Sequence, residues 1–271
     1  MTTNISSDSP IGVFDSGLGG LTVLRALEKI LPKESFLYFG DTAHVPYGTK
    51  SAETVTQYSR HILDFFVEHG TKAVVIACNT ASAVACTTLQ SEYEVPVFNV
   101  VTPSVEFAST ITKTQSVGVI GTTATVQSGA YTAAFNSLNR GISVKEISCP
   151  LFVPLIEEGW AETSIAREVA MQYLSPLSTL NTDTLILGCT HYPIMADTIL
   201  SAVPDHIQLV YSGETVGEQL KHHLKKEEKF NTENALKTTR FFVSDFPQKF
   251  DELGSRFLGR PLENVTHVSL L

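Results

Sequence analysis

The sequence predicts an α/β protein made of two pseudosymmetric domains from an internal duplication, each a mostly parallel sheet flanked by helices. Two observations support this prediction. Short apolar, β-branched runs alternate with longer amphipathic stretches, as in parallel strands joined by crossover helices. The same series of motifs also occurs twice in the same order along the chain, which indicates a repeated structural unit.

In the first half, four apolar runs are expected to form strands, and the amphipathic segment after each run is expected to form a helix. The expected strands are residues 11–15, 35–41, 73–78 and 95–100. The expected helices are residues 17–32, 51–70, 79–93 and 102–112.

The second half repeats this series. "SVGVIGTTATV" matches "PIGVFDSGLGG", "VKEISCPLFVPLIEEG" falls where "FLYFGDTAHVPYG" fell, and "IQLVYSGETV" repeats "VPVFNVVTPSV". The paired positions are Gly12 with Gly118, Val13 with Val119, Ser16 with Thr122, Pro46 with Pro154, and Cys78 with Cys189. Four matches in one order are difficult to explain without duplication.

We expect a first domain of residues 1–101 plus 212–271 and a second domain of residues 102–211. Short extended links near Val101–Pro103 and Tyr211–Gly213 are expected to carry the chain between them. The carboxyl-terminal segment holds the charge run "KHHLKKEEK", which is typical of a solvated helix face, and a strand candidate, "TTRFFVSDF". This tail is expected to pack back on the first domain.

Composition limits the classes of function. With 271 residues and 43% apolar residues, the chain is able to form a large core. The net charge of −9 argues against nucleic acid and anionic membranes as partners. The amino terminus "MTTNISSDSP" lacks a basic and apolar signal sequence, and no apolar run reaches the length of a membrane span. A cytoplasmic protein that binds a small molecule is therefore expected.

Two of the four cysteines have the same surroundings. Cys78 and Cys189 each follow an apolar run and a small residue, Ala77 or Gly188. Ligands of open α/β sheets bind at the carboxyl ends of strands, so both thiols are expected to face one cleft. Helix starts favour anions, which predicts a stabilised thiolate at each position. Two acid/base groups on opposite sides of a substrate suit inversion of a stereocentre.

The sequence also allows other interpretations. Cys86 and Cys149 are expected to be core residues. Cys189 and His191 have the spacing of a zinc pair but lack a second pair. "SGLGG" fails the dinucleotide fingerprint because Thr22 stands at the third glycine position; its glycines are expected to let the helix lie close to a substrate. Asp15 is an alternative helix cap. A single-thiol hydrolase or decarboxylase and a non-catalytic two-lobed binding protein remain as rival functions.

The motifs "FDSGLGGLTVL", "PYGTKS", "ACNTASA" and "GCTHYP" together resemble those of the aspartate/glutamate racemase family, and favour its glutamate racemases. The resemblance implies a cofactor-independent isomerase that supplies D-glutamate for bacterial peptidoglycan. It also implies an active site in the cleft between two domains, no metal, and a homodimer. Aspartate racemase and other two-cysteine racemases are the nearest alternatives.

The resemblance also implies roles for particular residues. Cys78 and Cys189 correspond to the two catalytic acid/bases, with Asp15 assisting Cys78, and with Glu157 and His191 assisting around Cys189. Glu158 is an equally good carboxylate by sequence. The implied substrate contacts are Asp15, Ser16, Tyr47, Gly48, Asn79, Thr80, Thr122, Thr125, Thr190 and His191. His44 stands where many relatives carry arginine, and regulation by cell-wall precursors does not follow from the resemblance.

Overall fold

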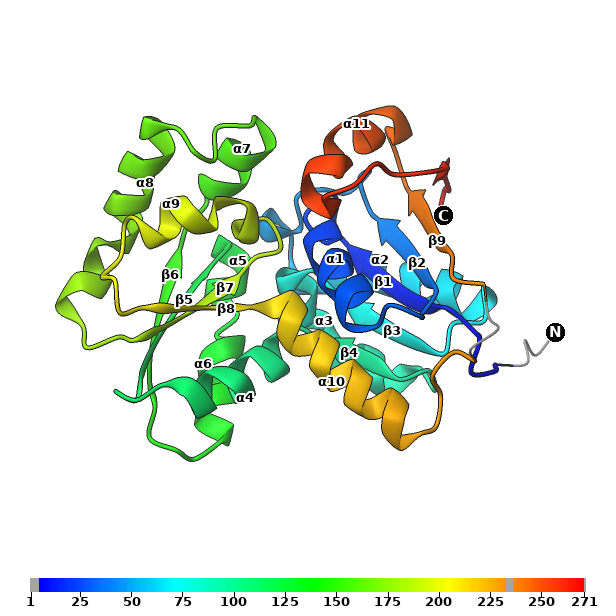
Figure 1. Cartoon of the computed structure of the whole chain (residues 1–271), viewed down its shortest axis with the longest axis horizontal. Helices are drawn as coiled ribbons and strands as arrows, with labels where there is room; N and C mark the ends of the chain where they lie inside the picture. The colour runs from blue at the N-terminus through cyan, green and yellow to red at the C-terminus, as the bar shows by residue number, and fades with distance from the viewer. Residues whose placement is uncertain (1–4, 233–235, 271) are drawn as a thin grey trace.

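The computed structural model describes residues 5–232 and 236–270, and its two sheets form two lobes side by side (Figure 1). Residues 1–4, the start of the polar amino-terminal segment, lie outside the described residues, as do residues 233–235 and 271. In the described part of the chain, no helix has both the length and the apolar character needed to cross a membrane.

The first sheet has six parallel strands in the order β10-β9-β2-β1-β3-β4. Strands β1, β2 and β3 are buried along their whole length, as expected for apolar strands covered on both faces. The elements before the crossing to the second sheet are β1 (Ile11–Asp15), α1 (Leu21–Ile30), β2 (Phe36–Gly40), a 3-10 helix (Tyr47–Thr49), α2 (Ala52–Glu68), β3 (Ala73–Ile76), α3 (Asn79–Glu92), β4 (Val97–Asn99) and α4 (Val101–Ile111).

The second sheet has four parallel strands in the order β6-β5-β7-β8. Its elements are β5 (Ser116–Gly121), α5 (Thr123–Gln127), α6 (Ala130–Ser137), β6 (Ser143–Ser148), α7 (Phe152–Glu157), α8 (Ser164–Leu174), a 3-10 helix (Ser175–Thr179), β7 (Thr184–Gly188), a 3-10 helix (Tyr192–Met195), α9 (Ala196–Leu200), β8 (Gln208–Tyr211) and α10 (Ser212–Lys226).

The strand order supports an internal duplication. Strands β2-β1-β3-β4 and β6-β5-β7-β8 follow the same order in their sheets, and the equivalent strands are those paired in the sequence. The predicted fold class, two sheets flanked by helices, is confirmed. In both sheets the third strand in chain order, β3 or β7, ends just before one of the two repeated cysteines.

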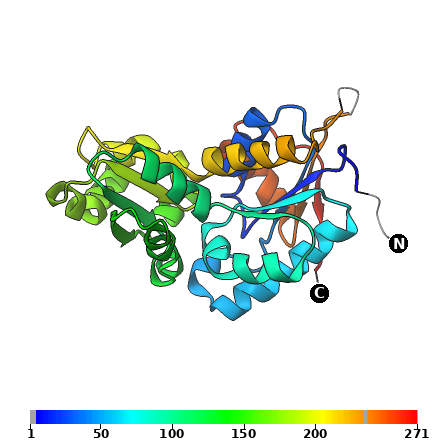
Figure 2. The same ribbon diagram turned by 90° about the horizontal axis from the view of Figure 1, so that it is seen from below.

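The chain crosses between the sheets through helices, so the expectation of short extended links is wrong. Helix α4 begins at Val101, directly after β4, and packs on α6 and β7 of the second lobe. Helix α10 begins at Ser212, directly after β8, and packs on α1 and α4. Figure 2 shows this golden helix lying along the first lobe. We propose domain boundaries at residues 101/102 and 211/212, where these crossings occur.

The carboxyl-terminal segment returns to the first sheet. It contains β9 (Thr239–Val243), α11 (Pro247–Leu258) and β10 (Val265–His267), and β9 pairs with β2. Lys72 Nζ and Glu34 Oε2 form a buried ion pair at 2.5 Å. Lys72 Nζ also donates a hydrogen bond to Asn231 Oδ1 at 2.9 Å. The hydrogen bond to Asn231 holds the segment that leads into β9, because a buried charge requires both a counter-ion and hydrogen-bonding partners.

Candidate active site

The two repeated cysteines line one cavity of about 370 Å³ between the lobes. Cys78 is 5% exposed and Cys189 is 6% exposed, so both sulfurs lie in a largely dry environment. The other lining residues are Ser16, Val45, Pro46, Tyr47, Gly48, Thr49, Asn79, Thr80, Thr122, Thr123, Cys149, Pro150, Val153, Pro154, Glu157, Thr190 and His191. Both thiols therefore face the same enclosed space from different sheets.

Cys78 lies at the start of α3, where its sulfur accepts a hydrogen bond from the Ala81 amide at 3.5 Å. Its second polar neighbour is the Ser16 hydroxyl, at 3.9 Å. Burial raises the pKa of the Cys78 thiol to about 12, with a further contribution from the Asp15 carboxylate, and the Ala81 amide only partly offsets this. The expected thiolate at the start of this helix is therefore wrong, because desolvation outweighs the helix start.

Cys189 has a different electrostatic partner. The helix after it is the four-residue 3-10 helix that starts at Tyr192, so little helix dipole acts on the sulfur. Instead, His191 Nδ1 lies 4.0 Å from Cys189 Sγ, and His191 Nε2 lies 3.0 Å from Glu157 Oε1. Burial lowers the pKa of His191, but the contacts with Cys189 and Glu157 outweigh it and raise the pKa to about 10. The His191 imidazolium therefore lies beside the Cys189 sulfur.

Asp15 lies behind the cavity and is not one of its lining residues. It is fully buried, and its carboxylate accepts hydrogen bonds from the Gly17 amide at 3.0 Å and the Thr190 hydroxyl at 3.3 Å. Burial raises the pKa of Asp15, partly countered by the charge of His191. Asp15 is not the cap of α1, whose first flanking residue is Gly20. From this position its charge raises the pKa of Cys78. Its hydrogen bond with Thr190 contacts the loop that carries Cys189.

Gly19 and Gly20, directly before α1, make room for protein rather than for substrate, contrary to expectation. A Cβ on Gly19 would lie well under 3.0 Å from Thr190 Oγ1 and from His191 Nδ1. Thr22, which stands at the failed third glycine position, donates a hydrogen bond to the Thr190 carbonyl at 2.7 Å. The start of α1 is thus the surface against which the loop carrying Cys189 is packed.

Hydrogen-bonding groups from both lobes meet across the cavity. The hydroxyls of Thr80, Thr122 and Thr125 lie 3.0–3.1 Å from one another. Asn79 is 2% exposed, and its Nδ2 is without a hydrogen-bond partner among the described residues. The Tyr47 hydroxyl donates to Asp41 at 2.6 Å. Hydroxyls and amides of this kind are suited to binding carboxylates.

All the predicted site residues line the cavity except Asp15 and Thr125, which contact lining residues from behind. The structure also separates the two neighbouring glutamates: Glu157 contacts His191, whereas Glu158 is not among the residues that line the cavity. His44 contacts Asp41 at 2.8 Å and stacks on Tyr58, also outside the lining.

Sequence reasoning missed two participants in the surroundings of the site. Cys149, expected to be structural, is fully buried, but it is also one of the residues lining the cavity. Tyr131 lies outside the lining, and its hydroxyl donates to Asn79 at 2.6 Å. Neither carried a sequence signal, because Cys149 has no equivalent thiol in the first half and Tyr131 lies in no repeated motif. Cys86 is buried on α3 as expected.

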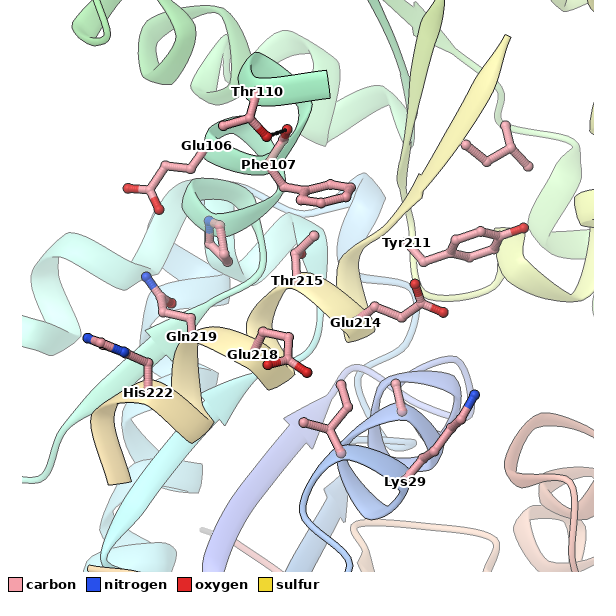
Figure 3. A pocket seen from close by; sticks show the side chains of 14 residues that line it. Lys29, Glu106, Phe107, Thr110, Tyr211, Glu214, Thr215, Glu218, Gln219 and His222 are labelled. Atoms are coloured by element: carbon pink, nitrogen blue, oxygen red, sulfur yellow. Dashed lines mark hydrogen bonds between the residues drawn. The ribbon is translucent and has the colours of Figure 1, made fainter. Parts of the chain in front are cut away.

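A larger cavity, of about 690 Å³, shares none of its lining residues with this one. It lies between α1, α4 and α10 (Figure 3), with Lys29, Glu106, Glu214 and Glu218 around it. No cysteine is among its lining residues, so the cavity between the two thiols is the candidate active site. Among the residues that the structure describes, no group of three or more His, Cys, Asp and Glu side chains is arranged to hold a metal ion.

Comparison with known proteins places these features in one family. Residues 11–216 match the family model described as Asp/Glu/Hydantoin racemase. The chain is 46% identical over 260 residues to the glutamate racemase of Geobacter metallireducens, covering 96% of both chains. The solved glutamate racemase RacE1 of Bacillus anthracis is 35% identical, with a TM-score of 0.93 over 97% of this chain and 98% of that one. The glutamate racemase of Francisella tularensis, solved in complex with D-glutamate, is 39% identical, with a TM-score of 0.91 over the same shares.

Proposed function

The chain belongs to the Asp/Glu/hydantoin racemase family and is an isomerase, and we propose that it interconverts L- and D-glutamate without a cofactor, using Cys78 and Cys189 as opposed acid/bases. The observation that carries this proposal is the pair of buried thiols lining one cavity. The names of the similar proteins support glutamate as the substrate.

The proposed reaction moves two protons and leaves the composition of the substrate unchanged. A thiolate on one side takes the proton from the α-carbon and becomes a thiol. The thiol on the other side gives its proton to the resulting carbanion and becomes a thiolate. Cys78 and Cys189 thus exchange protonation states in each turnover, and the reverse reaction uses the same groups in the opposite roles.

The remaining polar groups would bind and orient the substrate. The hydroxyls of Ser16, Thr80 and Thr122 and the free amide donor of Asn79 line the cavity, and they offer donors for the two carboxylates of glutamate. None of the described residues that line the cavity is a lysine or an arginine. Binding would therefore depend on neutral donors and on the His191 imidazolium.

The two thiols differ in their surroundings under this proposal. Cys78 would rest as a thiol, because burial and the Asp15 carboxylate raise its pKa to about 12. Cys189 instead has a positive charge beside it, because His191, with a pKa raised to about 10, keeps its charge at neutral pH. Glu157 would hold His191 in place, and Asp15 would tune the charge of Cys78.

The raised pKa of Cys78 predicts the order in which iodoacetamide modifies the thiols. The reagent attacks thiolates, and Cys78 remains a thiol at about pH 8, so we expect its labelling to be at least about tenfold slower than that of Cys189. The difference should shrink as the pH rises towards the Cys78 pKa of about 12. Peptide mass spectrometry after short exposure measures both sites. Faster labelling of Cys78 than of Cys189 at about pH 8 would contradict the proposed resting state of Cys78.

Activity itself is tested with purified, reduced protein and L-glutamate, without any added cofactor. We expect the circular dichroism signal of the amino acid to fall to zero as the racemic mixture forms. A parallel sample with aspartate tests the nearest alternative substrate. A constant signal with glutamate, from protein shown to be folded, would refute the proposal, and a loss of signal with aspartate alone would reassign the substrate.

The cellular role is also part of the proposal. Supply of D-glutamate for peptidoglycan, a cytoplasmic location and a homodimer follow from the resemblance to glutamate racemases, and the net charge of −9 agrees with partners other than nucleic acid or anionic membranes. A non-catalytic binding protein would not need two thiols in one cavity, and a decarboxylase would need only one.

A further inference from the structure

The side-chain amide of Asn79 has one end bound and the other free. Its Oδ1 accepts a hydrogen bond of 2.6 Å from the Tyr131 hydroxyl, whereas its Nδ2 has no partner among the described residues. Asn79 lines the cavity directly after Cys78 and is 2% exposed. A buried donor without a partner costs free energy, so its presence here indicates a ligand acceptor that the amide nitrogen would bind.

Tyr131 belongs to the other lobe and is held rigidly there. It lies on α6, is fully buried, and packs in one apolar cluster with Val119 and Ile186. Gly188, at the end of β7, leaves room for its ring, since a Cβ there would lie 3.3 Å from the ring edge. The Asn79 amide of the first lobe is therefore oriented by a fixed hydroxyl of the second.

We propose that Tyr131 is a positioning residue that turns the nitrogen of the Asn79 amide towards the cavity, where it donates to a carboxylate of the substrate. This inference rests on the proposed function, because it requires an anionic substrate in the cavity. Tyr131 itself does not line the cavity, so it acts on the substrate through Asn79 alone.

The Tyr131 hydroxyl is the donor in its hydrogen bond with Asn79 Oδ1. Burial raises the pKa of Tyr131 well above its ordinary value, so the hydroxyl keeps its proton for this bond. A hydrogen bond with the Ser212 side chain offsets part of that rise in pKa. With Tyr131 donating to Oδ1, the nitrogen of Asn79 faces the cavity. An amide turned by half a rotation would present its oxygen there and repel a carboxylate.

The test is Tyr131→Phe, which removes the hydroxyl and keeps the buried ring. We expect KM for both enantiomers of glutamate to rise about tenfold while kcat changes less than about threefold, because the lost interaction serves substrate binding. Tyr93→Phe is the matched control: it also deletes a bonded tyrosine hydroxyl, which contacts Asp64 in the first lobe, and KM should not change.

A double-mutant cycle separates this role from a general effect on packing. In an Asn79→Ala background, Tyr131→Phe should leave KM unchanged, because the amide that it positions is gone. An unchanged KM in the single variant, or the same rise in both backgrounds, would overturn the inference while wild-type turnover of glutamate still supported the proposed function. A wild-type protein that neither binds nor turns over glutamate would overturn the proposed function and, with it, the role of Tyr131.

Discussion

Replacing either Cys78 or Cys189 with serine is expected to lower the rate of glutamate racemisation by about 10³-fold or more in both directions. A hydroxyl does not ionise near neutral pH, so it neither removes the α-proton nor readily returns one. Each thiol is needed once per turnover, and both line the same cavity, so one remaining cysteine would not suffice. Initial rates from each enantiomer, followed by circular dichroism, measure the loss.

Cys86→Ser is the matched control for these variants. Cys86 is buried on α3, about two helix turns after Cys78, and does not line the cavity. Its variant should keep activity within about threefold of the wild type, since general acid/base catalysis does not involve it. A Cys189→Ser protein that retained a tenth of the wild-type rate would rule out the second thiol as an obligatory acid/base.

Gly19→Ala is expected to be strongly damaging although Gly19 does not line the cavity. The new Cβ would lie well under 3.0 Å from both Thr190 Oγ1 and His191 Nδ1, so the loop that carries Cys189 must move. Overpacking of this kind costs about 1–3 kcal/mol of unfolding free energy, and a displacement of about 1 Å at a catalytic group lowers the rate about 10²-fold. Urea unfolding and kcat/KM measure the two effects.

Gly17→Ala provides the comparison for that variant. Its Cβ would meet only Val45, at an ordinary contact distance of 3.5 Å. Gly17 precedes the same helix, so a general sensitivity of this glycine-rich segment would affect both variants alike. Near-normal stability and activity in Gly17→Ala, beside losses in Gly19→Ala, support the steric argument. Equal losses in both would contradict it.

The sequence predicted the architecture well because both signals for it, the apolar strands and the repeated motifs, can be recognised without the fold. Buried parallel strands are apolar along their length, so runs such as Ala73–Ile76 and Thr184–Gly188 stand out without any knowledge of the fold. Duplication then related Cys78 to Cys189, and strand ends in parallel sheets share an edge. These two steps were enough to predict that both thiols face one cavity.

The rest depended on contacts that local sequence does not contain. The crossings looked like extended links because Pro103 and Gly213 are weak helix formers. Both nevertheless lie in the first turns of α4 and α10, and each helix is held by packing on the lobe that the chain enters there. Glu157 and Glu158 differ only in the folded chain, where Glu157, at the end of α7, contacts His191.

The electrostatics of the site and the orientation of its side chains also could not be predicted from the sequence. The start of α3 indicated a thiolate at Cys78, but the degree of burial and the Asp15 carboxylate reversed that prediction. The free nitrogen of Asn79 depends on a hydroxyl from Tyr131, 52 positions away along the chain.

The proposed exchange of protons between two thiols is tested most directly by racemising L-glutamate in D₂O and measuring deuterium at the α-carbon of both enantiomers in the first few per cent of reaction. The mechanism predicts D-glutamate that carries deuterium from the opposing thiol, while the remaining L-glutamate keeps its protium. If the L-glutamate pool acquired deuterium as fast as the product formed, or if the product retained the original proton, a single group would be serving both sides and the account would be wrong.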